Sequence, residues 1–243
     1  MPLDDLTEDA LLGGRVRLAQ PRDGFRAAID PVLLAAFIPA RPGQRVLELG
    51  CGTGAAFLCL AARVPRLAVE AVERDPALAA LARANAARNG AAARIHAADL
   101  RALPKMEPVA HAFANPPYWP AGTASPHAAR RQAAHEDAPL ADWVRAMAGA
   151  VRPGGTVSLV LPAARWDEAA AALRAAGIGA LRLLPLWPRL GVAARRVLVG
   201  GRRGGRGPGE LLPGLVLHEG TGFSPAAEAV LRGGAALHEM DGA

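Results

Sequence analysis

The stretch "VLELGCGTGAAF" (residues 46–57) joins a strand-like run to a helix through a turn that contains three glycines. The apolar residues before the turn are typical of a buried strand, and the Ala-rich residues after it are typical of a helix. Gly50, Gly52 and Gly54 allow a sharp turn and the close approach of a ligand, because glycine has no Cβ atom. The start of the helix is expected to offer free N–H groups to that ligand. The stretch therefore predicts a ligand-binding turn at the end of a strand.

Strand-like runs and Ala-rich helical stretches alternate over the rest of the chain. The expected strands are residues 45–49, 68–73, 93–98, 109–114, 155–161, 180–186 and 194–200. The expected helices are residues 53–64, 75–90, 139–151 and 164–177. Such alternation predicts an α/β fold with a seven-stranded, mostly parallel sheet and helices on both faces. The short connection "WPRLGVA" (residues 187–193) suits a hairpin, so the last strand is expected to be antiparallel.

The composition favours a single folded domain over residues 1–243. Hydrophobic residues make up 51% of the chain, which is enough for a sizeable core. No run approaches the ~18 consecutive apolar residues of a membrane span, and the acidic N-terminus lacks the apolar segment of a secretory signal. Cys51 and Cys59 match neither a disulfide framework nor a zinc site, and free thiols fit a cytoplasmic location. Residues 200–214 are expected to form an exposed Gly- and Arg-rich loop, followed by a short helix within residues 224–234.

The net charge of +6 comes almost entirely from arginine, since Lys105 is the only lysine. A basic balance favours an anionic partner such as nucleic acid, through contacts with phosphates. A codon-composition bias also produces high Ala, Gly, Pro and Arg together. Charge alone leaves both explanations open.

Glycine turns of this kind occur in more than one class of cofactor-binding protein. Gly50, Gly52 and Ala55 satisfy the G-x-G-x-x-G/A fingerprint of dinucleotide-binding proteins, in which an acidic residue follows about twenty positions later. Glu73 stands there, at the end of the second expected strand, where it can accept hydrogen bonds from both ribose hydroxyls. Glu70 is the weaker candidate because it falls in the middle of that strand. An NAD-dependent oxidoreductase is the less favoured reading, since nothing after the turn supplies an acid or base for hydride transfer.

The run "VLELGCGTG" (residues 46–54) resembles the first motif of class I, Rossmann-like S-adenosylmethionine (SAM) methyltransferases. That motif has three alternate glycines and commonly an acidic residue at the position of Glu48. The next strand ends in "VERDP" (residues 72–76), which resembles the family's ribose-binding motif and implies this role for Glu73. Asp99 matches the position that contacts the adenine ring, although a simple helix cap also explains an aspartate there. The resemblance implies a Rossmann-like fold with SAM as the cofactor.

The stretch "AFANPPY" (residues 112–118) follows the fourth expected strand and contains the only tyrosine of the chain. It is predicted to lie at the carboxyl edge of the sheet, where open α/β folds bind ligands, although Asn-Pro and Pro-Pro are also ordinary turn sequences. Its last four residues resemble the (Asn/Asp/Ser)-Pro-Pro-(Tyr/Phe) motif of methyltransferases that modify planar amino or amide nitrogens. The Asn115 side-chain oxygen and the Pro116 carbonyl can each accept one N–H bond from such a nitrogen. Tyr118 offers a face for stacking of a flipped base, and Asn115 is expected to lie beside SAM.

The chain as a whole resembles the bacterial tRNA1(Val) adenine-N6 methyltransferase family, from about Gln20 to the C-terminal helix. In "DGFRAAIDPVLLAAFIP" (residues 23–39), Asp30 is expected to be the N-cap of an amphipathic helix that starts at Pro31. Similar segments form part of the SAM pocket in that family, which implies a cofactor-binding role for Asp30 and a covering role for residues 1–40. The resemblance implies methylation of the exocyclic N6 amine of an adenine in tRNA.

Arg130 and Arg131 are candidates to bind RNA phosphates, and a solvated charged loop explains them equally well. Other substrates of the same chemistry stay open, because the Asn-Pro-Pro-Tyr motif specifies chemistry better than target. Release-factor glutamine methyltransferases share the motif, but they carry a helical domain ahead of the glycine turn. Methylation of a guanine or adenine in ribosomal RNA is the other alternative, and the guanine-N2 enzymes more often have Phe in the fourth position. No metal is expected, since His96 and His111 lie inside strands and methyl transfer needs none.

Overall fold

The computed structural model describes residues 5–23, 27–117, 119–120, 135–136 and 138–237. Of the residues singled out in the sequence, Tyr118, Arg130 and Arg131 lie outside these ranges. No helix within the described ranges is both long enough and apolar enough to cross a membrane.

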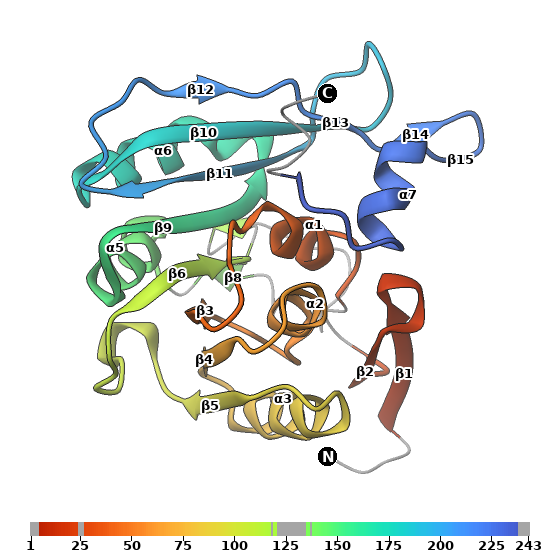
Figure 1. Ribbon diagram of the computed structural model, residues 1–243, viewed down its shortest axis with the longest axis vertical. Helices are drawn as coiled ribbons and strands as arrows, with labels where there is room; N and C mark the ends of the chain where they lie inside the picture. Colours follow the sequence, from red (N-terminus) through yellow and green to blue (C-terminus); the bar gives the residue numbers. More distant parts are fainter. Residues whose placement is uncertain (1–4, 24–26, 118, 121–134, 137, 238–243) are drawn as a thin grey trace.

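A nine-stranded sheet forms the centre of the molecule, in the order β12-β10-β11-β9-β6-β3-β4-β5 with β13 beside β10 (Figure 1). Its strands are β3 (Arg45–Leu49), β4 (Ala68–Glu73), β5 (Ala93–Ala97), β6 (Val109–Ala114), β9 (Val151–Pro162), β10 (Ile178–Trp187), β11 (Arg196–Arg203), β12 (Glu210–Leu211) and β13 (Leu215–Val216). The strands from β9 to β5 run parallel, and β11 lies antiparallel between β9 and β10. The predicted α/β fold, with its long strands and antiparallel last strand, is therefore confirmed.

Several very short strands were not among the predicted ones. β12 and β13 each have two residues and extend the sheet beyond β10. Two small pairs lie outside the sheet: β7 (Trp119–Pro120) with β8 (His135–Glu136), and β14 (His218–Glu219) with β15 (Gly222–Phe223). Two residues are too few to show a strand alternation pattern, which explains why the sequence does not predict them.

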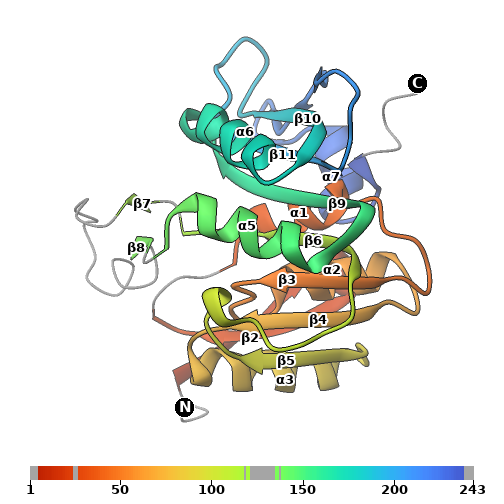
Figure 2. The same ribbon diagram turned by 90° about the vertical axis from the view of Figure 1, so that its left-hand side faces the viewer.

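The parallel strands bring their carboxyl ends to one edge of the sheet. Figure 2 shows β3, β4 and β5 pointing the same way, toward the side that carries β7 and β8. Within the sheet, Leu49 at the end of β3 pairs with Val72 of β4 and with Ala114 of β6. The glycine turn, Glu73 and Asn115 follow or end these strands, so they are neighbours on this edge.

Helices cover both faces of the sheet (Figure 1). One face carries α1 (Asp30–Phe37), α2 (Ala55–Arg63), α3 (Pro76–Arg88) and α7 (Pro225–Leu231), and the other carries α5 (Leu140–Ala150) and α6 (Trp166–Ala175). Three short 3-10 helices complete the described chain: η2 (Leu12–Gly14), η3 (Leu100–Ala102) and η4 (Ala163–Arg165). The buried side chains of each face form a separate hydrophobic core, which is the arrangement expected for a sheet covered on both sides.

The helix expected at Asp30 differs from the prediction in two ways. α1 begins at Asp30 itself, with Ile29 as its N-cap residue and no side-chain cap, so Asp30 lies inside the first turn. Every residue from Pro31 to Phe37 is buried, and the helix is therefore not amphipathic. The reason is its position, because α1 packs against α2, α7 and β9.

The predicted exposed loop at residues 200–214 is also partly wrong. β11 continues through Arg203, so Gly200 and Gly201 are buried inside the sheet. A Cβ atom at Gly200 would lie 2.6 Å from the carbonyl oxygen of Val157, and one at Gly201 would lie 2.7 Å from Leu181 Cδ2. These glycines therefore serve close packing between strands, and the exposed connection begins only after Arg203.

An antiparallel hairpin of β1 (Leu6–Leu11) and β2 (Val16–Pro21) packs against α3 through the fully buried Asn85. The Ala19 N–H donates to Asn85 Oδ1, and Asn85 Nδ2 donates to the Ala19 carbonyl, both at 2.9 Å. The same Nδ2 donates to the Thr53 carbonyl in the glycine turn at 2.9 Å. Asn85 thus connects the N-terminal hairpin, α3 and the turn.

The variant Asn85→Ala is expected to lower the free energy of unfolding by about 2–4 kcal/mol, because it leaves buried main-chain groups of Ala19 and Thr53 without partners. Asn89→Ala is the matched control, since Asn89 makes similar bonds to the Arg17 main chain at a partly exposed position. Water can replace those bonds, so its cost is expected to be about 1 kcal/mol. Urea unfolding followed by circular dichroism measures both values, and equal losses would contradict the role given to Asn85.

Candidate active site

The glycine turn joins β3 to α2 at the carboxyl edge. Gly50, Gly52 and Gly54 have φ values of 64°, 53° and 95°, in the left-handed region that favours glycine. Several N–H groups of the turn are used within the protein: those of Gly50 and Cys51 donate to the Val72 carbonyl at 2.8 and 3.1 Å, and that of Gly54 donates to the Cys51 carbonyl at 2.8 Å. The expected free N–H groups are those at the start of α2, where the Phe57 N–H is already bonded to Glu48 and the Leu58 N–H to the Gly54 carbonyl.

Only one of the three glycines faces open space among the described residues. A Cβ atom at Gly50 would lie 2.6 Å from the indole ring of Trp143, and one at Gly54 would lie 2.6 Å from the ring of Phe57. A Cβ atom at Gly52 would meet nothing within 4 Å. Gly50 and Gly54 are thus required by the packing of aromatic rings, and Gly52 is the glycine that leaves room for a ligand.

Glu48 lies beneath the turn, inside β3, with only 2% of its surface exposed. Its Oε2 accepts a hydrogen bond from the Phe57 N–H in the first turn of α2 at 2.8 Å. Burial raises the pKa of the Glu48 carboxyl well above its usual range, although the Phe57 bond partly opposes this shift. Glu48 therefore fixes the start of α2 relative to the strand and has no direct opening to solvent.

Glu73 holds the turn from its other side. At the end of β4, its Oε2 accepts from the Gly52 N–H at 2.8 Å and its Oε1 accepts from the Asp75 N–H at 2.9 Å. The side chain stays partly exposed at the sheet edge. Glu70 is placed differently, since it pairs with His96 at 2.7 Å within the sheet. Glu73 thus lies at the carboxyl edge and Glu70 lies within the sheet, and the ligand-side role of Glu73 stays a prediction.

The two glutamates distinguish between the cofactor classes that the glycine pattern allows. A dinucleotide pyrophosphate needs free N–H donors at the turn and the helix start. Here the Gly52 and Phe57 donors are occupied by Glu73 and Glu48, and the Glu73 carboxylate would repel a phosphate placed against it. A cofactor with a positively charged sulfonium and a ribose diol suits the same groups. The site therefore fits SAM better than NAD.

Asp99 is held by its own loop. Its Oδ1 accepts from the Arg101 N–H and Nε at 2.8 and 2.9 Å, and its Oδ2 accepts from Arg101 Nη2 at 2.7 Å. These hydrogen bonds from Arg101 hold the pKa of Asp99 well below its usual range. Asp99 caps the 3-10 helix η3, which is the helix-cap alternative left open by the sequence.

Asn115 and Pro116 directly follow β6, whose last residue pairs with Leu49 just before the glycine turn. Asn115 is partly buried and Pro116 is buried, so both lie in a constrained position beside the turn. The structure thus brings Glu73 and Asn115 to one edge, with Glu48 beneath the turn inside β3, while Tyr118 falls outside the described residues.

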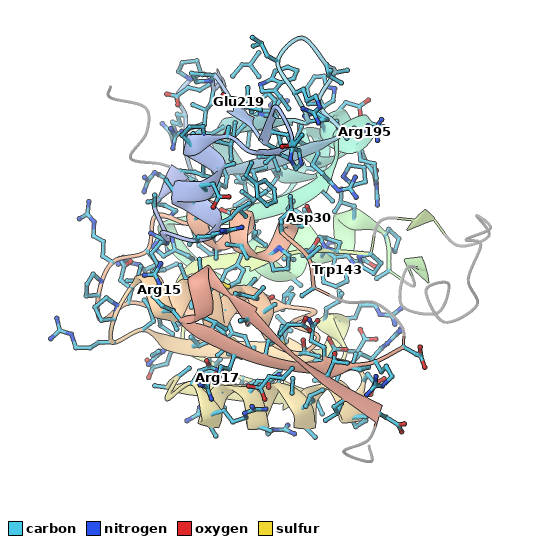
Figure 3. The ribbon with its side chains drawn as sticks, turned by 90° about the vertical axis from the view of Figure 1, so that its right-hand side faces the viewer. Arg15, Arg17, Asp30, Trp143, Arg195 and Glu219 are labelled. Atoms are coloured by element: carbon cyan, nitrogen blue, oxygen red, sulfur yellow. The ribbon has the colours of Figure 1, made fainter. Side chains whose placement is uncertain are left out.

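Sequence reasoning missed two residues at this edge, Trp143 and Arg196. Trp143, from α5, packs on Gly50, and its buried Nε1 has no hydrogen-bond partner in the part of the chain that is described. Arg196, at the start of β11, pairs with Asp30 at 3.2 Å and ties α1 to the sheet. Figure 3 shows Trp143 and Asp30 on the same side of the molecule. The sequence signal for Trp143 was an aromatic residue on the buried side of the helix at residues 139–151, the first helix expected after the Asn-Pro-Pro segment.

The histidines within the strands have protein partners. His96 contacts Glu70, and His111 lies 2.8 Å from Thr156 Oγ1 and 2.9 Å from Gln44 Oε1. No group of three or more His, Cys, Asp or Glu side chains able to hold a metal occurs within the described ranges.

A mostly parallel sheet with a carboxylate-held glycine turn at its carboxyl edge fits the class I SAM-dependent methyltransferases, which the sequence resembles. Residues 28–142 match the family model described as "Methyltransferase small domain". A crystal structure of a predicted O-methyltransferase from Agrobacterium tumefaciens superposes with a TM-score of 0.72 and 27% identity, covering 85% of this chain and 97% of that one.

Curated relatives define the family more narrowly. The tRNA1(Val) (adenine(37)-N6)-methyltransferase of Aeromonas hydrophila is 32% identical, over 83% of this chain and 86% of its own length. The enzyme of the same name from Dickeya chrysanthemi is 32% identical over 77% of both chains. The chain belongs to the tRNA1(Val) (adenine(37)-N6)-methyltransferase family, and it is a SAM-dependent methyltransferase. The resemblance noted in the sequence is thereby confirmed.

The buried Glu48 is expected to make stability depend on pH. Because its pKa is raised in the folded state, the native protein binds more protons than the unfolded chain between the two pKa values, and stability falls as pH rises through that window. Glu48→Gln keeps an acceptor for the Phe57 N–H but does not titrate. The unfolding free energy of wild type minus that of Glu48→Gln is therefore expected to fall as the pH rises above the usual pKa range of a glutamate carboxyl.

Urea unfolding at several pH values measures this difference. Glu107→Gln is the control, because Arg45 lowers the pKa of the exposed Glu107 and its titration lies below this pH range. A wild-type minus Glu48→Gln difference that stays constant over the range would show that Glu48 is not perturbed by burial.

Proposed function

We propose that the protein transfers the methyl group of SAM to the exocyclic N6 amine of an adenine in tRNA. The observation that carries this proposal is the match of most of the chain to relatives named tRNA1(Val) (adenine(37)-N6)-methyltransferases. The position of Asn115 beside the glycine turn supports it, because the target amine needs a hydrogen-bond acceptor for its N–H groups next to the cofactor. The chain acts as one domain in the cytoplasm, where tRNA is, and residues 1–40 cover the cofactor pocket.

Gly52, the glycine that faces open space, would leave room for the cofactor. SAM supplies an electrophilic methyl group on a positively charged sulfonium. Glu73 is anchored by the Gly52 and Asp75 N–H groups and uses its remaining lone pairs to accept from the ribose hydroxyls. Asp99, held by Arg101, would contact the adenine ring of the cofactor, and Asp30, in the first turn of α1, would contact its methionine part.

Three further residues serve cofactor binding by shaping the turn. Glu48 fixes the start of α2 through the Phe57 N–H. Gly50 and Gly54 leave space for the rings of Trp143 and Phe57, which pack against the turn. These contacts position the backbone of the turn before the cofactor arrives, so little ordering is required on binding.

Asn115 and Pro116 activate the target amine. An adenine amino group is a poor nucleophile because its lone pair is delocalised into the ring. The Asn115 side-chain oxygen and the Pro116 carbonyl accept one N–H bond each, which holds both protons to one side and aims the lone pair at the methyl group. The new N–C bond forms as the S–C bond breaks, and the amine then releases one proton to water. Tyr118 stacks on the flipped base.

The test is a transfer assay with radiolabelled SAM against three pools from a strain that lacks the gene: bulk tRNA, ribosomal RNA and release factor. Label in tRNA that is recovered as N6-methyladenosine is the expected result. Label in ribosomal RNA or release factor, or label in tRNA recovered as a 2′-O-methylated nucleoside, would overturn the proposed substrate. Arg130→Ala combined with Arg131→Ala then tests whether these residues bind phosphates, through the salt dependence of tRNA binding.

Asn115→Ala is expected to lower methyl transfer to tRNA by at least about 100-fold, because one acceptor of the target amine is lost. Its affinity for SAM, measured by isothermal titration calorimetry, is expected to stay close to that of wild type. Asn115→Asp is the matched control, since it keeps an oxygen acceptor at the same position and should retain more activity. Wild-type turnover in Asn115→Ala would contradict the role of Asn115.

A further inference from the structure

A cavity of about 260 Å³ lies at the carboxyl edge of the sheet, beyond the glycine turn and Asn115. Its apolar walls include Ile29, Leu186, Pro188 and Leu217, which come from segments far apart in the chain. The cavity also borders the ion pair between Asp30 and Arg196. The proposed cofactor and amine contacts do not use the apolar part of this space.

The strand register places this cavity near the target site. Ala114, just before Asn115, pairs with Leu159 of β9, and the same stretch of β9 pairs Pro162 with Arg196 of β11. Neighbouring strands lie about 4.8 Å apart and rise about 3.3 Å per residue, so Arg196 lies roughly 10 Å from Ala114 across the strands and roughly 10 Å further along them. The cavity is therefore close enough to receive the part of a polymeric substrate that flanks the reacting group.

His218 gives the cavity a rigid aromatic platform. Its ring stacks on Phe223 with centroids 4.8 Å apart and an interplanar angle of 20°. Its Nδ1 lies 3.2 Å from the Gly222 carbonyl oxygen, which further fixes the ring plane. Histidine and phenylalanine rings are surfaces on which unpaired nucleic-acid bases stack.

Arg195 supplies a positive charge at the rim of the same cavity. The segment from Pro188 to Arg196 contains three arginines and no acidic residue. Arg196 pairs with Asp30, and Arg189 donates to the Gly220 carbonyl at 2.7 Å. The exposed Arg195 side chain has no hydrogen bond or ion pair to any residue that the structure describes. Figure 3 shows Arg195 above Asp30 on this side of the molecule.

We propose that this cavity binds a nucleotide that neighbours the methylated adenine in the same RNA. Its base stacks on His218 between the apolar walls, and its phosphate is bound by Arg195. This inference rests on the proposed function, because it requires an RNA substrate. It explains how an unpaired stretch of RNA is held while one adenine is turned into the site beside Asn115.

The test compares Arg195→Ala and His218→Ala with wild type, using unmethylated tRNA from the strain that lacks the gene. Each variant is expected to raise KM for tRNA roughly tenfold, while kcat and SAM affinity stay unchanged. The salt dependence of tRNA binding should become shallower for Arg195→Ala only, by roughly 0.7 in log–log slope for one lost phosphate contact. His218→Phe should restore the wild-type KM, because phenylalanine also stacks on a base.

Arg206→Ala is the matched control, since Arg206 is exposed and follows the far end of β11, at the opposite edge of the sheet. If Arg195→Ala and His218→Ala behave like Arg206→Ala while wild type methylates tRNA, the cavity proposal is wrong and the proposed function stands. If wild type does not methylate tRNA, the proposed function and the cavity proposal are both wrong. A stem-loop RNA that lacks the base next to the target adenine adds a second check. Wild type and His218→Ala should bind this RNA equally, because the base that stacks on His218 is missing.

Discussion

Two glutamates hold the glycine turn, and the rest of the site depends on this constraint. Glu73 accepts from the Gly52 N–H at the sheet edge, and Glu48 accepts from the Phe57 N–H beneath the turn. These bonds use donors that a phosphate would otherwise need, and they leave a carboxylate facing the ligand side. A cofactor that carries a sulfonium and ribose hydroxyls is compatible with them. The preference for SAM over a dinucleotide thus follows from how the turn is held as much as from its glycines.

Strand direction supplies the second constraint. β3, β4, β6 and β9 are parallel, so their carboxyl ends lie at one edge of the sheet. The turn, Glu73 and Asn115 come at these ends and are therefore neighbours. The antiparallel β11 begins at this same edge, and it places Arg195 and Arg196 beyond the reacting site. The two proposals together place cofactor, target amine and flanking nucleotide in order along this single edge, which suits an enzyme that acts on one base of a polymer.

Local patterns made the sheet, the turn and the Asn-Pro-Pro segment predictable. Strand runs, alternate glycines and proline pairs are features of a few neighbouring residues, so no knowledge of packing was needed. The contact between Gly50 and Trp143 could not be predicted, because it joins segments far apart in the chain. The burial of α1 on all sides depends in the same way on α7 and β9. Gly201 looks like a loop glycine in the sequence, yet strand packing buries it.

The most direct measurement is a crystal structure of the protein with S-adenosylhomocysteine and a tRNA stem-loop that contains the target adenine in its unmethylated form. We expect a hydrogen bond from the ribose hydroxyls to Glu73, with the cofactor passing over Gly52. We also expect the adenine N6 within hydrogen-bond distance of the Asn115 side-chain oxygen and the Pro116 carbonyl. A cofactor that does not contact Glu73, or an adenine bound away from Asn115, would contradict the account.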